Sequence, residues 1–182
     1  MPDNFLRRRK GRSTCRDMAY LIDGFNLLYK FPEFEELMAR HMLVQARMGL
    51  LERLKEFVRL TGKKVRIVFD GKKQQSLDLR SETVGSIDVY YSLDYSADFL
   101  IKEFVKKDLN PRMTTVVTSD NGIISYVARF GVKLKKSEEF ADLVTKTIED
   151  SRQEKRIEKD YDPMVSAEEV KYWEKMFGKK KP

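Results

Sequence analysis

Short apolar runs that end at polar turn residues recur along the chain and alternate with stretches of helical periodicity. The first run, residues 18–23, has three consecutive apolar residues and ends at Asp23, which Gly24 follows. Consecutive apolar residues between polar neighbours are typical of a strand that is buried on both faces. Asp23 therefore stands where such a strand would leave its sheet.

Two later runs repeat this arrangement. The apolar segment 65–69 ends at Asp70, and the segment 114–119 ends at Asp120, which is again followed by turn-forming residues. A further acid, Asp98, falls in the first turn of a predicted helix, where the helix dipole favours a negative charge whatever else that charge does. The sequence thus places three acids at strand ends and a fourth at a helix start.

The remaining segments complete an alternating pattern of helices and strands. Apolar periodicity and capping residues predict helices from Pro32, over 43–61 before Gly62, from Ser96, over 121–129, from Ser137 and from Ser166, and strands at 87–91 and 132–134. Met48 and Phe99 fall on the predicted core sides of their helices. Residues 26–31 and 72–85 are predicted to be loops. The aromatic residues of the last helix are predicted to pack on the body of the protein.

Strands that alternate with helices predict a parallel sheet, whose strands all end at the same edge. Asp23, Asp70 and Asp120 would share this edge, and Asp98 would join them. Crowded carboxylates repel each other unless a cation neutralises them, and oxygen ligands select Mg²⁺ or Mn²⁺. Such an ion can activate water for the hydrolysis of a phosphodiester. For any one strand-end acid, a turn-capping role explains the sequence equally well.

The charge of the chain is concentrated at its ends. The net charge is +7, of which residues 1–16 contribute +5 and residues 179–181 contribute +3, so the body is close to neutral. Basic tails attract nucleic acid or another polyanion, although a solubilising role accounts for them too. The single cysteine, Cys15, and the lack of a long apolar segment predict a cytoplasmic protein without a membrane span.

Four motifs together resemble a known family. In order, Leu21–Asn26, Val68–Gly71, Ala97–Asp98 and Thr118–Asp120 are similar to the successive motifs of YacP-like NYN-domain ribonucleases, in the PIN-like nuclease superfamily. The resemblance covers about residues 18–150 and leaves out the tails and the last helix. It implies a PIN-like three-layer α/β/α sandwich with a central, mainly parallel sheet, and metal-dependent endoribonuclease activity.

The resemblance also implies roles for individual residues. The implied catalytic and metal-binding residues, for Mg²⁺ or Mn²⁺, are Asp23, Asp98 and Asp120. The implied supporting residues are Asn26, Asp70, Ser119 and Asn121. Phe99 stands where the family often has an acid, which leaves catalysis with one metal ion or with two open.

The sequence divides into three predicted parts. These are a basic, disordered tail over 1–17, the nuclease domain over 18–150, and a charged helical extension with a basic tail over 151–182. Basic side chains expected to contact the RNA backbone are Arg7, Arg8, Arg9, Lys72, Lys73 and Arg80. The expected partner is messenger or ribosomal RNA, with the ribosome as a further candidate.

Other functions need residues that this sequence lacks or places elsewhere. A phosphate-switch receiver domain needs paired acids after the first strand, and a hydrolase with an aspartyl nucleophile needs an acid where Phe25 stands. The glycine and lysines at 62–64 follow a helix and precede a strand, which is the reverse of a phosphate-binding loop. A noncatalytic RNA-binding or ribosome-associated adaptor with the same fold remains the alternative.

Overall fold

The computed structural model describes residues 19–71, 81–92, 95–160 and 167–177. The chain divides into two compact units, Met1–Ile148 and Glu149–Pro182. Several predictions lie outside the described residues, namely the tail 1–17, most of the loop 72–85 and the cap at Ser166. The three-part division of the sequence stays a prediction.

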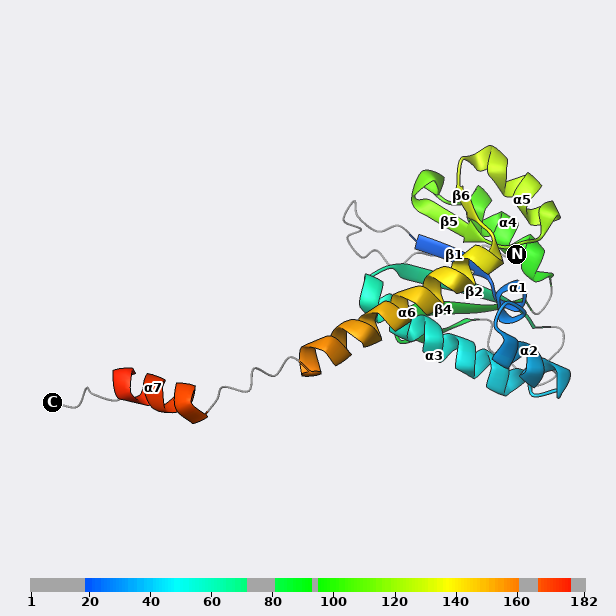
Figure 1. Ribbon diagram of the computed structural model, residues 1–182. Coiled ribbons are helices and arrows are strands. Elements are labelled where there is room, and N and C mark those ends of the chain that lie inside the picture. Colours follow the sequence, from blue (N-terminus) through cyan, green and yellow to red (C-terminus); the bar gives the residue numbers. More distant parts are fainter. Residues whose placement is uncertain (1–18, 72–80, 93–94, 161–166, 178–182) are drawn as a thin grey trace. The chain divides into compact units, whose positions relative to one another are not determined.

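The first unit is built on a six-stranded sheet (Figure 1). Its strands are β1 (Ala19–Asp23), β2 (Lys64–Asp70), β3 (Ser81–Val84), β4 (Ile87–Ser92), β5 (Thr114–Val117) and β6 (Lys133–Lys135), in the order β3-β4-β2-β1-β5-β6. Among these strands, every neighbouring pair is parallel except β3 with β4. The chain runs outward from β1 through β2 to β4 and then crosses to β5. The ends of β1 and β5 therefore form the switch point of the sheet, where α/β proteins bind ligands.

Helices cover both faces of the sheet, which gives the predicted three layers (Figure 1). The helices are α1 (Gly24–Leu28), α2 (Pro32–Ala39), α3 (Leu43–Thr61), α4 (Ala97–Lys106), α5 (Asn121–Val127), α6 (Ser137–Asp160) and α7 (Ala167–Phe177). Short 3₁₀ helices span Pro111–Met113 and Ala128–Phe130. One layer holds α1, α2, α3 and the start of α6, and the other holds α4 and α5. Within the described ranges, no helix is long and apolar enough to cross a membrane.

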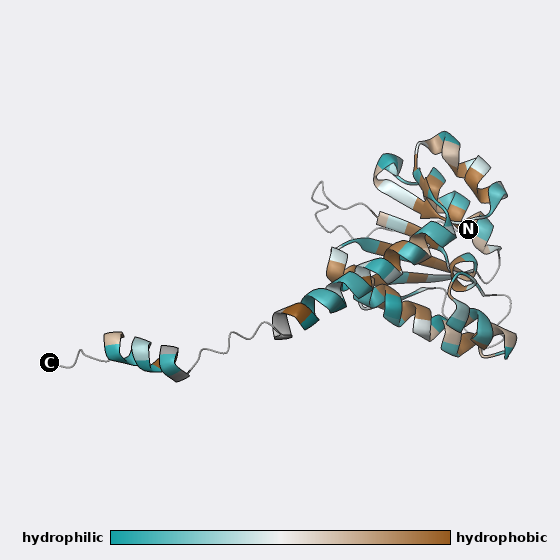
Figure 2. Ribbon diagram, in the orientation of Figure 1, coloured by the Kyte–Doolittle hydropathy of each residue, from teal (hydrophilic) through white to brown (hydrophobic). Residues whose placement is uncertain are grey.

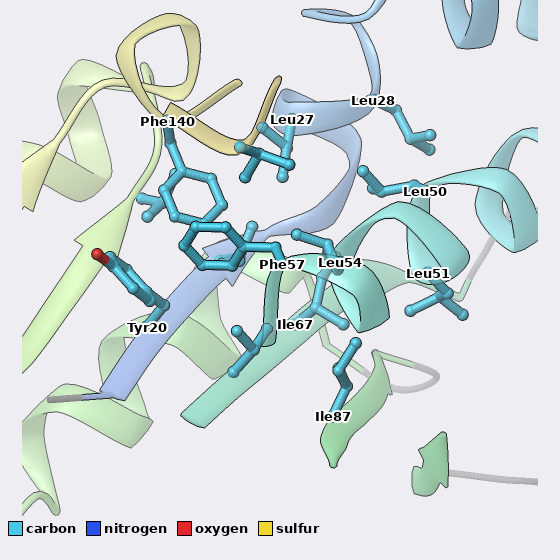
Figure 3. Close-up of a cluster of buried hydrophobic side chains, with 14 of the residues drawn as sticks. Tyr20, Leu27, Leu28, Leu50, Leu51, Leu54, Phe57, Ile67, Ile87 and Phe140 are labelled. Carbon is cyan, nitrogen blue, oxygen red and sulfur yellow. The ribbon is translucent and has the colours of Figure 1, made fainter. Parts of the chain in front are cut away.

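Successive residues of each strand pack on opposite faces of the sheet. In β1, Tyr20 and Ile22 join the cluster beneath α1, α3 and α6, whereas Leu21 joins the cluster beneath α4 and α5. Figure 3 shows the first cluster, in which the rings of Phe57 and Phe140 meet edge to face at 5.6 Å between centroids. In Figure 2 hydrophobic residues gather in the central strands, and the helices around them alternate between hydrophobic and hydrophilic residues. Burial on both faces explains the uninterrupted apolar runs of the sequence.

Three predicted boundaries are wrong. Residues 26–28, predicted to be a loop, belong to α1, because Asp23 caps a helix directly after β1. Residues 81–84, in the second predicted loop, form β3; this edge strand is short and polar, so its pattern is weak. The strand predicted over 114–119 ends at Val117.

Two apolar residues assigned to the core are exposed. Met48 is 62% exposed and Phe99 is 43% exposed. Beside Met48, the side chain of Arg47 is buried instead, with its guanidinium carbon 5.7 Å from the ring centroid of Phe69 and 5.2 Å from that of Tyr91. The aromatic rings therefore hold a buried cation at a position where sequence periodicity favours a hydrophobic residue.

The second unit contains the end of α6 and the helix α7. In α7 the rings of Trp173 and Phe177 stack with 5.4 Å between their centroids, and both side chains are exposed. The prediction that these aromatic residues pack on the body of the protein stays a prediction.

Gly24 sets how closely α1 approaches β2. A Cβ atom at this position would lie 2.4 Å from Cδ1 of Phe69 and 2.9 Å from the carbonyl oxygen of Val68. The carbonyl oxygen belongs to a central strand and cannot move away without disturbing the sheet. The glycine that follows Asp23 is therefore required by packing as well as by the turn.

We expect Gly24→Ala to destabilise the protein by about 1–3 kcal/mol, because the added methyl group overpacks this contact. Urea denaturation of the parent and the variant measures the loss. Phe69→Leu removes the ring that the methyl group meets, so the double variant should regain part of the loss. Gly62→Ala is the control, because its cost comes from a φ of 65° in open space and should not depend on Phe69. Full additivity of Gly24→Ala and Phe69→Leu would contradict this account.

Candidate active site

Asp23 ends β1 and caps α1. Its Oδ1 accepts a hydrogen bond from the backbone N–H of Asn26 at 3.1 Å, and its Oδ2 accepts one from the hydroxyl of Thr118 at 3.3 Å. The carboxylate thereby satisfies one of the free N–H groups at the start of the helix. A capping role is thus present at Asp23, and the same contacts fix the direction of its side chain.

Three of the predicted acids act on one another's charge, as the pKa of Asp23 indicates. Burial raises the pKa of Asp23 above its ordinary value, the hydrogen bonds from Asn26 and Thr118 lower it, and the negative charges of Asp120 and Asp98 raise it further. The carboxylates of Asp98 and Asp120 therefore lie close enough to Asp23 to repel its charge. A partly buried acid in this position gains from any cation that binds beside it.

Asp120 caps α5 just as Asp23 caps α1. Its Oδ1 accepts the backbone N–H groups of Gly122 at 2.7 Å and Ile123 at 3.1 Å. The residue is exposed and directly follows the segment that leaves β5. Two of the acids are therefore held by the starts of short helices at the switch point of the sheet.

Asp98 lies in the first turn of α4, which Ser96 caps by accepting the backbone N–H of Phe99 at 3.1 Å. Its Oδ2 accepts a hydrogen bond from Nζ of Lys102 at 2.9 Å. Its Oδ1 is buried and has no hydrogen-bond partner among the described residues. A buried carboxylate oxygen without a partner is costly, so this atom is available to a cation or to a donor on a ligand.

Thr118 is a site residue that the sequence analysis did not identify. Its side chain is buried, and its Oγ1 donates to Asp23 and accepts the backbone N–H of Asp120 at 3.1 Å. One hydroxyl thus links the two capping acids. The available signal was a hydroxyl residue two positions before a strand-end acid, a spacing that favours a hydrogen-bonded turn.

Ser119 binds the start of α6 rather than the acids. Its Oγ accepts the backbone N–H of Ser137 at 3.0 Å and donates to Oε2 of Glu138 at 2.5 Å. Oε1 of Glu138 pairs with Nζ of Lys30 at 2.6 Å. Hydrogen bonds from Lys30 and then from Ser119 lower the pKa of Glu138 to about 2. Lys30 and Glu138 were not identified from the sequence, because their pairing depends on the fold.

The other predicted residues take separate positions. Asp70 ends β2 and accepts the hydroxyl of Ser92 on the neighbouring strand at 3.4 Å. Asn26 contributes its backbone N–H to Asp23, and Asn121 is exposed at the first position of α5. Their supporting roles stay predictions. The basic residues expected to contact RNA, at positions 7–9, 72, 73 and 80, lie outside the described residues.

The acids have the chemistry of a site for Mg²⁺ or Mn²⁺, although the side chains alone do not complete one. Within the described ranges, no three His, Cys, Asp or Glu side chains are grouped so that they could hold a metal ion. Mg²⁺, however, usually binds one or two carboxylates and fills its remaining positions with water and substrate phosphate. The unpaired Oδ1 of Asp98 and the repulsion at Asp23 fit such an ion.

We expect Thr118→Val to raise the pKa of Asp23 further, because it removes a hydrogen bond that favours the ionised carboxylate. It should also cost about 1 kcal/mol of stability. Titration of the Asp23 carboxyl carbon by NMR measures the pKa. Thr114→Val is the matched control. It removes a hydroxyl that donates a hydrogen bond to Asp108 at the other end of β5, so the pKa of Asp23 should stay unchanged. An unchanged Asp23 pKa in Thr118→Val would contradict the link.

The low pKa of Glu138 predicts a contribution to stability that depends on pH. Because the pKa is lowered on folding, the contribution is present above the ordinary value of about 4.5 and is lost as the pH falls toward about 2. Glu138→Gln should therefore flatten the loss of stability between pH 5 and pH 2, as measured by urea denaturation. Glu139→Gln, next to it on the exposed surface, should leave the profile as in the parent. Parallel profiles for all three proteins would contradict this prediction.

Two crystal structures have the same fold. A mutant form of Rae1 (YacP) from Bacillus subtilis has a TM-score of 0.62 and 22% sequence identity over 82% of this chain and 86% of that one. A second structure of Rae1 (YacP) from Bacillus subtilis has a TM-score of 0.58 and 24% identity over 87% and 93%. The observed sheet and these matches confirm the predicted PIN-like α/β/α fold. No curated protein matches the chain.

The family model matches a longer part of the chain than the four motifs cover. The family model described as YacP-like NYN domain matches residues 20–178. The match includes α7 and so extends beyond residue 150, near which the resemblance of the motifs ends. Since the match spans most of the sequence, the chain belongs to the YacP-like NYN domain family, a family of PIN-like nucleases.

Proposed function

We propose that the protein is a metal-dependent endoribonuclease that hydrolyses RNA phosphodiester bonds at the carboxyl edge of its sheet. The observation that carries the proposal is at the switch point between β1 and β5, where burial and the negative charges of Asp120 and Asp98 raise the pKa of the Asp23 carboxyl. Proteins keep repelling carboxylates together at a cost in stability, which is common at sites that bind cations. Membership of a nuclease family supports the same activity.

In this proposal Asp23, Asp98 and Asp120 hold Mg²⁺ or Mn²⁺ together with water and the RNA phosphate. When bound there, such an ion would lower the pKa of a water molecule and would stabilise negative charge on the leaving oxygen. Thr118 and the N–H of Asn26 hold the Asp23 carboxylate in one orientation. Donors and acceptors fixed in advance in this way reduce the reorganisation that a reaction requires.

Positive charge at the same edge would bind the RNA backbone. Nζ of Lys102 lies 2.9 Å from Oδ2 of Asp98. The basic residues of the N-terminal tail and of the segment 72–80 would add contacts that do not depend on sequence. The proposed substrate is messenger or ribosomal RNA in the cytoplasm, with the ribosome as a further partner.

A second candidate is a noncatalytic RNA-binding or ribosome-associated adaptor. It is favoured by one observation, that no three potential ligands in the described part of the chain are grouped to hold a metal ion. An adaptor would keep the acids for the helix caps that Asp23 and Asp120 provide. RNA binding without any metal-dependent cleavage separates this candidate from the nuclease.

We expect the purified chain to cleave a pool of single-stranded and structured RNA with Mg²⁺ or Mn²⁺ and to lose this activity in EDTA. Asp23→Asn, Asp98→Asn and Asp120→Asn should each lower the cleavage rate about 100-fold or more, equivalent to about 2.7 kcal/mol. Cleavage that persists in EDTA, or that survives all three substitutions, would contradict the proposal.

Two controls separate lost chemistry from lost structure. Asp108→Asn removes a carboxylate at the opposite end of β5 and should leave cleavage unchanged. Asp23→Asn should be at least as stable as the parent at pH 7, because the raised pKa of Asp23 means that its ionisation opposes folding above that pKa. Mg²⁺ should raise the melting temperature of the parent more than that of Asp23→Asn.

A further inference from the structure

Two exposed aromatic rings stack on each other at the start of α4. The side chains of Tyr95 and Phe99 are 50% and 43% exposed, their ring centroids lie 4.7 Å apart, and their planes differ by 23°. The residues of α4 that pack against the sheet are others, namely Ile101, Phe104 and Val105. Tyr95 and Phe99 therefore present aromatic surface to solvent that the fold does not use.

This aromatic pair lies beside the acidic site. Phe99 directly follows Asp98, and on a helical surface it is a neighbour of Lys102, three residues further on. Asp98 and Lys102 form an ion pair along one row of the helix, and Phe99, on the next row, stacks with Tyr95, which precedes the N-cap Ser96. Any RNA phosphate that reaches Asp98 would bring its attached nucleoside within reach of these rings.

The stack is held in place by its local structure. Ser96, between the two aromatic residues, caps α4 and accepts the N–H of Phe99. The first helical turn is thereby fixed, and each ring restricts the rotation of the other. Two preorganised rings lose little conformational entropy when a flat ligand stacks on them.

The surroundings combine cations with a further aromatic ring, and surfaces that bind single-stranded nucleic acid combine the same two kinds of group. Nζ of Lys102 lies 5.3 Å from the ring centroid of Tyr126 on α5. The guanidinium carbon of Arg129 lies 3.8 Å from the same centroid. Lys102 on α4 and Arg129 in the 3₁₀ helix after α5 thus place two cations around Tyr126, where they can bind phosphates.

We propose that Tyr95 and Phe99 form a stacking platform for an unpaired base of the RNA substrate, next to the bond that is cleaved. This inference rests on the proposed nuclease function and adds to it a subsite that binds a base. Bases within a duplex keep their faces covered by their neighbours and cannot stack on a protein ring. Because every base has an aromatic face, the platform selects unpaired RNA without selecting a sequence.

Binding of a single-stranded oligoribonucleotide that contains 2-aminopurine tests the platform. The full chain is used in EDTA, so that cleavage does not enter the measurement, and stacking of the fluorescent base on a ring quenches its emission. Tyr95→Ala and Phe99→Ala should each weaken binding about tenfold and reduce the quenching, while binding of duplex RNA stays unchanged. Both positions are exposed, so the fold should tolerate these changes.

Matched variants identify the interaction. Phe99→Trp should retain binding and quenching, whereas Phe99→Leu, which is apolar but lacks a π-face, should behave like Phe99→Ala. Met48→Ala removes an exposed apolar side chain from α3, on the other layer, and should have no effect. Unchanged quenching in Tyr95→Ala and Phe99→Ala, or an equal loss of single-stranded and duplex binding, would overturn the platform.

The results distinguish a failure of the stacking platform from a failure of the proposed nuclease function. If the parent cleaves RNA with metal and the aromatic variants bind and cleave as it does, the platform fails and the proposed function stands. If the aromatic variants lose stacking while the parent never cleaves RNA with metal, the platform stands as an RNA-binding site and the nuclease fails.

Discussion

The hydrogen bonds that Asp23 accepts from Asn26 and Thr118 join three parts of the molecule that converge at the candidate site. They connect the end of β1 with the first turn of α1 and with the segment that leaves β5. Because Thr118 also accepts the N–H of Asp120, the direction of one capping acid depends on the other. The start of α1 in turn depends on Gly24, which lets the helix lie directly against β2.

This arrangement has an electrostatic cost. Burial and two neighbouring negative charges oppose the ionisation of Asp23, and Oδ1 of Asp98 is buried without a partner among the described residues. Groups that are unfavourable for stability but held rigidly are typical of sites that act on a charged ligand. Glu138 differs from these acids. Lys30 pairs with one oxygen of its carboxylate and Ser119 donates a hydrogen bond to the other, so its charge serves to hold α6.

The surface of α4 has three parts with different roles. Ile101, Phe104 and Val105 bury one face against the sheet, Asp98 carries charge toward the other acids, and the third face is aromatic and exposed. Phe99 directly follows Asp98, so the exposed aromatic pair begins next to one of the three acids.

The sequence by itself determined the strands of the parallel sheet and the acids at their ends, because strands buried on both faces leave continuous apolar runs and the turns after them need acids and glycines. It could not determine which side chains meet. Thr118 lies 95 residues from Asp23, and only the pairing of β1 with β5 brings them together. Periodicity also assigned Phe99 to the core. A periodic pattern of apolar residues locates a helix well, but it is less accurate about where the buried face of the helix ends. The tertiary structure decided that edge, because the sheet covers only one side of α4 and leaves the aromatic pair in solvent.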